Sequence, residues 1–256
     1  MLPTPGALRS LLLVLTGGLL GACAEAEGEP VKPAHAPAPA PAPAEGPLVI
    51  ELFTSQGCSS CPSADQLLGK LARAGQLGGR AVVPLSFHVD YWNDLGWSDP
   101  YSLPAWTERQ HRYAGALGEA RVYTPALVVG GAAAMVGSNT LAVSQAIADA
   151  PRVALLPATA RWTAEHVEIT TTAPAGADVL IAVFEEARRV KVTRGENAGA
   201  TLANHRIVRR LERVAAAGQR GTLRVALDPA WRELGAVVFA QRPDQRIVAA
   251  TLVPRR

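Results

Sequence analysis

The spacing of apolar residues predicts strands and helices in alternation from residue 48 onward. The short, mostly apolar runs 48–53 and 81–89 are typical of buried strands. The segment 63–73 between them is predicted to be a helix, because Pro62 suits a first helical turn and apolar residues recur on one face. The residues of that face are Ala64, Leu67, Leu68 and Leu71.

The same pattern continues to about residue 150. Two further helices and a pair of strands joined by a Gly-Gly turn are predicted, at 105–117, 141–148, 125–129 and 132–136. The proline-containing stretch 94–104 is predicted to be irregular. The expected order is strand, helix, strand, helix, strand, strand, helix, which we assign to an α/β domain over 48–150.

After residue 151 the pattern changes to strands alone. Apolar residues alternate or cluster at strand lengths between turn residues, at 153–162, 167–172, 179–184, 222–227, 237–241 and 247–252. Segment 202–215 fits a strand or a helix equally well. The sequence therefore predicts a mainly β, sandwich-like domain over 151–256.

The first 23 residues predict an export signal. A single cationic residue, Arg9, precedes an apolar run at 11–20 that is too short to span a membrane. The following Leu20-Gly21-Ala22-Cys23 resembles a bacterial lipobox, in which Cys23 would be lipidated; an ordinary signal peptide with an incidental Cys23 is the alternative.

Residues 24–47 predict a tether behind that anchor. Ala-Pro repeats prevent helix formation and favour an extended, semi-rigid spacer. We expect an exported protein held by lipidated Cys23, at the outer membrane and facing the periplasm, because Ala24 rather than Asp follows the cysteine. The choice between inner and outer membrane stays open.

Charge and cysteine content argue against a nucleic-acid-binding protein and against a small disulfide-stabilised protein. The net charge is +3, and the basic residues between 188 and 210 are interspersed with acidic ones, which indicates a solvated face and no nucleic-acid partner. Three cysteines are too few for a disulfide scaffold, so the fold must be stabilised by packing.

The main candidate for chemistry is Cys58-Ser59-Ser60-Cys61, which follows a predicted strand and precedes a predicted helix. A thiolate at a helix N-terminus is favoured by the helix dipole and by free N–H groups. We therefore expect a redox pair in which Cys58 attacks and Cys61 resolves the mixed disulfide.

Two other uses of the cysteine pair stay open. A zinc or copper site would need further ligands, and there is no second CxxC, although His88 and His111 could contribute. A static disulfide in a non-catalytic binding module is compatible with export. No metal and no cofactor are assigned to the site.

The segment from Phe53 to Asp65 resembles the signature of an exported bacterial family catalogued as domain of unknown function 1223, which is placed in the thioredoxin-like superfamily. Further segments resemble the same family, at 86–92, 95–100, 122–125, 128–131 and 194–199. The resemblance runs from about residue 49 to the C-terminus. It implies a thioredoxin-like domain fused to a β-rich one, and no established activity.

A thioredoxin-like fold implies two further roles. A cis-proline preceding the third strand would pack against the cysteines, and the sequence offers Pro125, with Thr124 pairing to a partner's backbone. Glu51, on the strand leading to the cysteines, would be a buried acid that exchanges a proton with Cys61. An ordinary turn proline and an outward-facing glutamate are the alternatives.

Polar and aromatic residues also gather after the strand 81–89, at the end of the sheet where sites form in α/β proteins. His88 is a candidate for stabilising the Cys58 thiolate or relaying a proton, or else is a packed loop histidine. Three aromatic residues would line a substrate groove or cover the sheet: Tyr91, Trp92 and Trp97.

The segment 194–199 is predicted to be a turn with capping groups, and a site shared between the two domains is the alternative. Taken together, the sequence predicts an extracytoplasmic thiol–disulfide oxidoreductase whose partners are protein thiols or disulfides. The alternatives are a non-catalytic binding or assembly lipoprotein and a copper or zinc chaperone. The direction of electron flow and the oligomeric state stay open.

Overall fold

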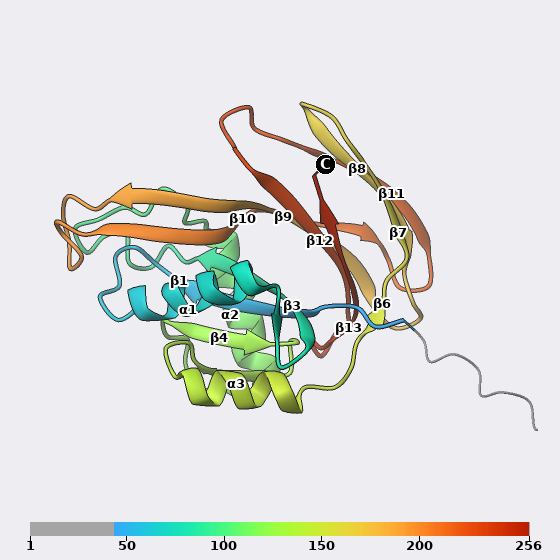
Figure 1. Cartoon of the computed structure of the whole chain (residues 1–256), viewed down its shortest axis with the longest axis horizontal. Coiled ribbons are helices and arrows are strands. Elements are labelled where there is room, and N and C mark those ends of the chain that lie inside the picture. The colour runs from blue at the N-terminus through green and yellow to red at the C-terminus, as the bar shows by residue number, and fades with distance from the viewer. Residues whose placement is uncertain (1–43, 256) are drawn as a thin grey trace, which may run out of the picture. The chain divides into compact units, whose positions relative to one another are not determined.

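The computed structural model describes residues 44–255, which form a ten-stranded mixed sheet, three helices and a three-stranded antiparallel sheet (Figure 1). The predicted signal peptide, the lipobox Cys23 and the tether up to residue 43 lie outside the described residues. The last four residues assigned to the tether, 44–47, pack against the folded part, since Glu45 bridges Ala154 and the Gly46 N–H donates to Val153 O at 3.0 Å.

The first half of the chain has the predicted order of strands and helices. Its elements are β1 (Leu48–Thr54), α1 (Pro62–Ala74), β2 (Gln76–Leu77), β3 (Arg80–His88), α2 (Pro104–Leu117), β4 (Ala126–Val129), β5 (Ala133–Val136) and α3 (Thr140–Asp149). The two-residue strand β2, which the periodicity did not predict, is the one addition. Strands β1 and β3 are parallel and connected through α1, while β4 pairs antiparallel with β1.

Side chains of β1 alternate between two cores, which fixes what lies on each face of the sheet. Leu48, Ile50 and Leu52 pack with the apolar residues of α1 and α3. Val49 and Phe53 pack on the other face, with Trp106 and Tyr113 of α2 and with residues of the second half of the chain. A strand buried on both faces needs a continuous apolar run, and β1 has one except at Glu51 and its last residue, Thr54.

Every element after residue 150 is a strand. The strands are β6 (Ala154–Leu155), β7 (Ala158–Trp162), β8 (His166–Thr172), β9 (Asp178–Lys191), β10 (Thr201–Ala215), β11 (Arg220–Ala226), β12 (Leu234–Gln241) and β13 (Ile247–Pro254). The ambiguous segment 202–215 is thus a strand, β10, which pairs along its length with β9.

Both halves of the chain share the large sheet, whose order is β5-β4-β1-β3-β10-β9-β12-β13-β6; its tenth strand, β2, pairs with β3 outside this order. The join is a parallel contact between β3 and β10, at Ser86 and Ile207. No local periodicity predicts a pairing between residues so far apart, and the sequence therefore suggests two separate units. The boundary assigned at 150/151 falls between α3 and β6 and stays a prediction.

The small sheet, β11-β8-β7, covers the face of β9 and β12 that points away from α2. Val167 and Ile169 of β8 and Val225 of β11 are buried against Val179 and Ile181 of β9. Two sheets therefore pack on each other in the second half.

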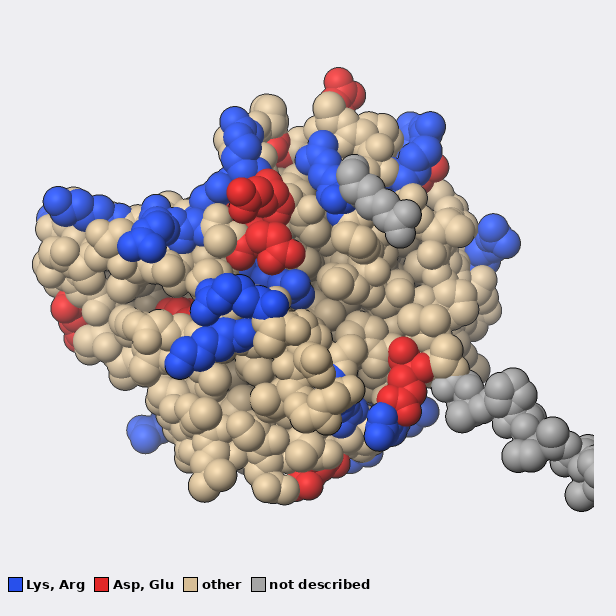
Figure 2. Space-filling view, in the orientation of Figure 1, with Lys and Arg blue, Asp and Glu red and all other residues tan. Residues whose placement is uncertain are grey.

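On the face shown in Figure 2, Lys and Arg side chains lie in several groups separated by uncharged surface, with acidic side chains between two of them. Within residues 44–255, no helix combines the length and the apolar character needed to cross a membrane.

Candidate functional site

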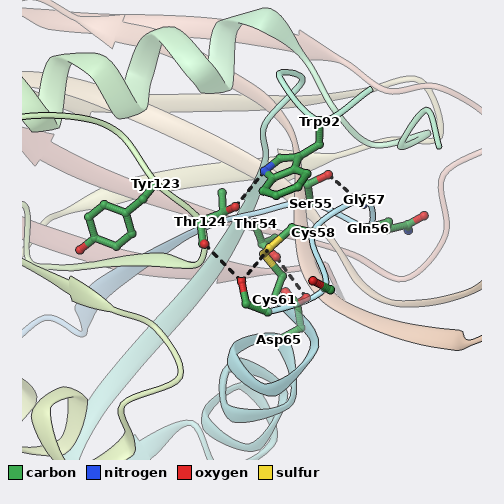
Figure 3. The surroundings of a disulfide bond; sticks show 12 residues. Thr54, Ser55, Gln56, Gly57, Cys58, Cys61, Asp65, Trp92, Tyr123 and Thr124 are labelled. Atoms are coloured by element: carbon green, nitrogen blue, oxygen red, sulfur yellow. Dashed lines mark hydrogen bonds between the residues drawn. A yellow bond between two sulfur atoms is a disulfide. The ribbon is translucent and has the colours of Figure 1, made fainter. Parts of the chain in front are cut away.

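Cys58 and Cys61 form a disulfide at the junction of β1 and α1 (Figure 3). Cys61 is the N-cap residue of α1, and Pro62 occupies the first helical turn, where its missing N–H has no helical partner to lose. The Cys61 N–H donates to Cys58 O at 3.2 Å, which closes the turn between the two residues. The pair therefore lies where the sequence predicts it, at a helix start.

Both cysteines are completely buried, at 0% exposure, although Ser59 and Ser60 between them are exposed. The Ser60 hydroxyl lies 3.3 Å from Cys58 Sγ and donates to Thr124 O at 3.4 Å. Thiol–disulfide exchange requires access to a sulfur atom. A partner can reach this disulfide only after the residues around it move.

The peptide bond between Thr124 and Pro125 is cis, and Pro125 is buried directly before β4. Thr124 lies beside the disulfide, because its carbonyl oxygen accepts the Ser60 hydrogen bond. The indole Nε1 of Trp92 donates to Thr124 Oγ1 at 2.9 Å, so the indole lies over the cysteines (Figure 3). The structure thus brings Trp92, Thr124 and Pro125 to the cysteine pair, while their partner-binding role stays a prediction.

The other two predicted aromatic residues border the same loop less directly. Trp97 donates from Nε1 to Gln56 Oε1 at 3.0 Å, two residues before Cys58. Tyr91 is 39% exposed and donates to Gln110 Oε1 of α2 at 3.2 Å. Gln110 in turn donates to Tyr123 O at 2.6 Å. A groove for a substrate along these residues stays a prediction.

Glu51 points to the opposite face of the sheet from α1 and the cysteines. It is buried at 0% exposure and pairs with Arg109 of α2, at 2.5 Å from Oε2 to Nε and 2.9 Å from Oε1 to Nη2. The Tyr113 hydroxyl also donates to it, at 2.5 Å. Because the pleat alternates, a side chain at this position packs with Val49 and Phe53. This position does not favour the proton exchange with Cys61 predicted for Glu51.

A different carboxyl group, that of Asp65, lies under the cysteines. Asp65 is on α1, one helical turn after Cys61, and its side chain is buried and accepts a hydrogen bond from Thr54 Oγ1 at 3.1 Å (Figure 3). Burial raises the pKa of Asp65 to about 7, against the opposing effects of His88 and Thr54. The sequence carried a signal for it, since Cys61, Asp65 and Leu68 have helical spacing and share the core face.

His88 ends β3 as a buried residue beneath the loop that precedes Cys58. Its Nδ1 lies 2.7 Å from Asp99 Oδ2, and the same oxygen accepts the Gln56 N–H at 2.8 Å. Burial alone would lower the pKa of His88, but Asp99 and Asp65 outweigh it and raise that pKa. Burial would raise the pKa of Asp99, and His88 with the backbone N–H groups lowers it.

Two buried side-chain atoms of this cluster, His88 Nε2 and Gln56 Nε2, make no hydrogen bond to any residue within 44–255. No hydrogen bond in that range joins His88 to either sulfur atom, so a direct role on Cys58 stays a prediction. The structure instead pairs buried His88 with Asp99, and the charge of Asp65 also raises the pKa of His88.

The turn between β9 and β10 also reaches the cysteine loop. Glu196 Oε2 accepts the Ser59 N–H at 3.0 Å, and Asn197 Nδ2 donates to Gln56 O and Cys58 O at 2.9 and 3.0 Å. The structure therefore brings the turn 194–199 into contact with the cysteine loop. The sequence predicted a turn with capping groups there, and a site shared between the two domains was the alternative. Among residues 44–255, no group of three or more His, Cys, Asp or Glu side chains is arranged to hold a metal ion.

A family model described as "Protein of unknown function (DUF1223)" matches residues 49–241. The chain is similar to protein AGR_C_4864 from Agrobacterium tumefaciens, a solved structure, with 30% sequence identity and a TM-score of 0.63 over 83% of this chain and 96% of that one.

A second solved structure, HBP35 of Porphyromonas gingivalis, is similar in fold, with a TM-score of 0.56 over 82% of this chain and 75% of that one. At 14% identity the likeness extends to the fold alone. No curated protein sequence matches this chain.

Proposed function

This chain belongs to the DUF1223 family, whose function is unknown, and from the geometry of its own site we propose that it is an extracytoplasmic thiol–disulfide oxidoreductase on a thioredoxin-like fold. The observation that carries the proposal is the Cys58–Cys61 disulfide at the start of α1, beside the cis peptide bond before Pro125. The βαβ unit of β1, α1 and β3, followed by β4, β5 and α3, is the arrangement expected of such a fold.

The proposed reaction is a disulfide exchange. A thiolate of the partner attacks Cys58 Sγ, the Cys58–Cys61 bond breaks, and Cys61 leaves with the electron pair. A second partner thiolate then attacks the partner's sulfur in the mixed disulfide and Cys58 leaves with the electron pair, so the partner becomes oxidised and the cysteine pair gains two electrons and takes up two protons. The same steps run in reverse when the partner is the disulfide.

Asp65 is the group best placed to exchange the proton of Cys61. It lies one turn along the same helix from that cysteine and is buried with it. A carboxyl group with a pKa of about 7 is partly protonated at neutral pH, so it can both donate and accept a proton there. His88, which lies close enough to Asp65 to affect its pKa, would stabilise the ionised form.

Exchange also requires the site to open. Two groups beside the disulfide, the Ser60 hydroxyl and the indole of Trp92, are each tied to Thr124 by a hydrogen bond. A hydrogen bond of this kind contributes on the order of 1 kcal/mol. These two bonds thus contribute little to the cost of opening, and a partner backbone that pairs with Thr124 would replace them.

We further propose that the protein acts as a lipoprotein on the periplasmic side of the outer membrane, held by lipidated Cys23, with protein thiols or disulfides as partners. An exported setting permits a stable disulfide such as this one.

A second function is favoured by one observation, the complete burial of both cysteines. An inaccessible disulfide suits a binding or assembly lipoprotein in which the thioredoxin-like fold is a scaffold. The two proposals differ in whether the disulfide reacts in the folded protein.

The test is a redox titration of the purified full chain in glutathione buffers, with alkylation and mass spectrometry at Cys58 and Cys61. The oxidoreductase proposal expects reversible interconversion without unfolding, monitored by circular dichroism. Reduction only under denaturing conditions would support the scaffold proposal instead. A Cys61→Ser variant should trap mixed disulfides in the native host, whereas the matched Cys58→Ser variant should trap few.

A further inference from the structure

The turn that connects β9 and β10 lies directly on the redox loop, far from it in sequence. Three hydrogen bonds make the contact: one from the Ser59 N–H to Glu196 and two from the Asn197 amide to Gln56 O and Cys58 O. Cys58 is therefore held on both sides of its peptide unit by one turn of the second half. Its surroundings depend on that turn as well as on β1 and α1.

The position of Glu196 is set by the backbone of the turn. Gly199 N donates to Val192 O and Ala198 N donates to Gly195 O, at 2.9 and 3.1 Å. Gly195 has φ +76 and packs against Gly96, whose added Cβ would come within 3.3 Å of the Gly195 Cα. Gly96 and Gly195 thus allow the loop before Asp99 to contact the turn. These contacts and the backbone hydrogen bonds fix the position of the Glu196 backbone.

The hydrogen bonds from Ser59 lower the pKa of Glu196 further below neutrality, so its carboxylate is negative at neutral pH. Other charged groups near Cys58 come from α1, which supplies Asp65, from β3, which supplies His88, and from the following loop, which supplies Asp99. Those three are buried, whereas Glu196 is exposed, and the segment before β4 contributes the uncharged pair Thr124 and Pro125. Glu196 is thus the one of these charges that salt can screen strongly.

We propose that Glu196 makes the Cys58–Cys61 disulfide harder to reduce, by holding a negative charge beside the thiolate that reduction creates at Cys58. The inference rests on the proposed oxidoreductase function. The acceptor contact to the Ser59 N–H, at 3.0 Å, also occupies a backbone donor next to Cys58 that would otherwise favour the thiolate. Glu196 acts through Cys58 and is a positioning residue.

The equilibrium affected is the exchange with glutathione. Two glutathione thiols lose two electrons and form glutathione disulfide, while the Cys58–Cys61 bond breaks and takes up those electrons. The protons pass to the two cysteines, except for the fraction of Cys58 that stays ionised and leaves its proton in the solvent. A negative charge beside Cys58 reduces that fraction and shifts the equilibrium toward the protein disulfide.

The test compares the purified full chain with its Glu196→Gln variant, which loses the charge and keeps an oxygen for the Ser59 N–H. Glu165→Gln is the matched control, because Glu165 is an exposed glutamate of the small-sheet region and the variant has the same net charge. We expect Glu196→Gln to shift the glutathione equilibrium toward the dithiol by about two- to fivefold, the range for an exposed charge, and to lower the pH midpoint of Cys58 alkylation.

Salt separates a charge effect from a structural one. In about 1 M sodium chloride the variant and the wild type should converge, because the charge of Glu196 is then screened within a few ångströms. The wild type alone should move toward the dithiol as salt rises, which tests the inference even if the variant folds poorly. An unchanged equilibrium in Glu196→Gln, or a difference that survives high salt, overturns the inference and leaves the oxidoreductase proposal standing. Failure of the wild type to exchange with glutathione overturns both.

Discussion

The backbone N–H of Asp65 donates to the carbonyl oxygen of Cys61 at 3.1 Å, and this helical contact places a buried carboxyl group beneath Cys61. A buried carboxyl with a raised pKa is stabilised in its protonated form and destabilised when it ionises. The folded protein therefore binds a proton at this position that the unfolded chain has already released.

Replacing Asp65 by Asn should stabilise the protein above about pH 7 and change little near pH 4. The folded-state pKa of about 7 exceeds the ordinary 3.8, so wild-type stability falls as the pH rises between those values. Asn cannot ionise and can still accept the Thr54 hydrogen bond. Urea unfolding of the oxidised proteins should show a gain on the order of 1–3 kcal/mol at about pH 8. An equal effect at both pH values would contradict the assignment.

Asp65→Asn should leave the protein folded and impair its disulfide exchange. We expect the wild-type rate of glutathione exchange to show an inflection near pH 7 and Asp65→Asn to lose it, because Cys61 would no longer have its proton partner. Asp149→Asn is the control, since Asp149 is an exposed residue of α3. An inflection retained in Asp65→Asn would exclude this carboxyl as the proton acceptor.

Glu51 should contribute to the stability of the fold and have little effect on the redox equilibrium of the cysteines. Glu51→Gln leaves the Arg109 guanidinium buried without its carboxylate, which costs on the order of 3–5 kcal/mol. The glutathione equilibrium of the cysteines should stay within about twofold of wild type, because Glu51 is on the other face of the sheet. The double variant Glu51→Leu/Arg109→Met, which removes both charges, should be less destabilised than either single variant in urea. A shifted redox equilibrium in Glu51→Gln would restore the proton role predicted from the sequence.

Trp92 should control access to the disulfide. Trp92→Phe removes the donor to Thr124 Oγ1 and keeps an aromatic ring, so the closed form should lose about 1 kcal/mol of stability relative to the open form. Reduction by dithiothreitol should then be about fivefold faster. Trp162→Phe serves as the control, because the Nε1 of Trp162 has no hydrogen-bond partner within residues 44–255. Equal reduction rates for the two variants would argue against a cover formed by Trp92.

Local patterns in the sequence were sufficient for the elements near the cysteines. Strands β1 and β3 correspond to the predicted runs 48–53 and 81–89, and helix α1 to the predicted apolar face with Leu68 and Leu71. Each of these elements is buried in the core, so its apolar residues recur with the period of a strand or a helix. Segment 202–215, in contrast, stayed ambiguous between strand and helix because its apolar period is weak. β10 is a bulged strand with Arg206 at φ +46, so its alternation is interrupted and its period is weak.

Long-range relationships in the site were beyond those patterns. Glu51 is an acid in an apolar strand, and the sequence does not say which face it takes or that Arg109, on a later helix, pairs with it. The contact of Asn197 with Cys58 O depends on the pairing of β10 with β3, which positions the whole β9–β10 hairpin. The position of Asp65 could be predicted from helical spacing, because Cys61 and Asp65 are four residues apart and therefore lie on the same face of α1.

His88 should stabilise the fold through its charge. Its folded-state pKa is raised above the ordinary 6.5, so its contribution is fully present below about pH 6.5 and is lost as the pH rises through the folded-state value. In His88→Asn the buried Asp99 keeps its backbone donors and loses its cationic partner, which should cost on the order of 3–5 kcal/mol near pH 6 and clearly less near pH 9. Urea unfolding at the two pH values measures this difference. The exposed His111 of α2 provides the control, because His111→Asn should change stability little at either pH. A loss in His88→Asn that is the same at both pH values would mean that His88 contributes through packing, since the packing of a neutral ring does not depend on pH.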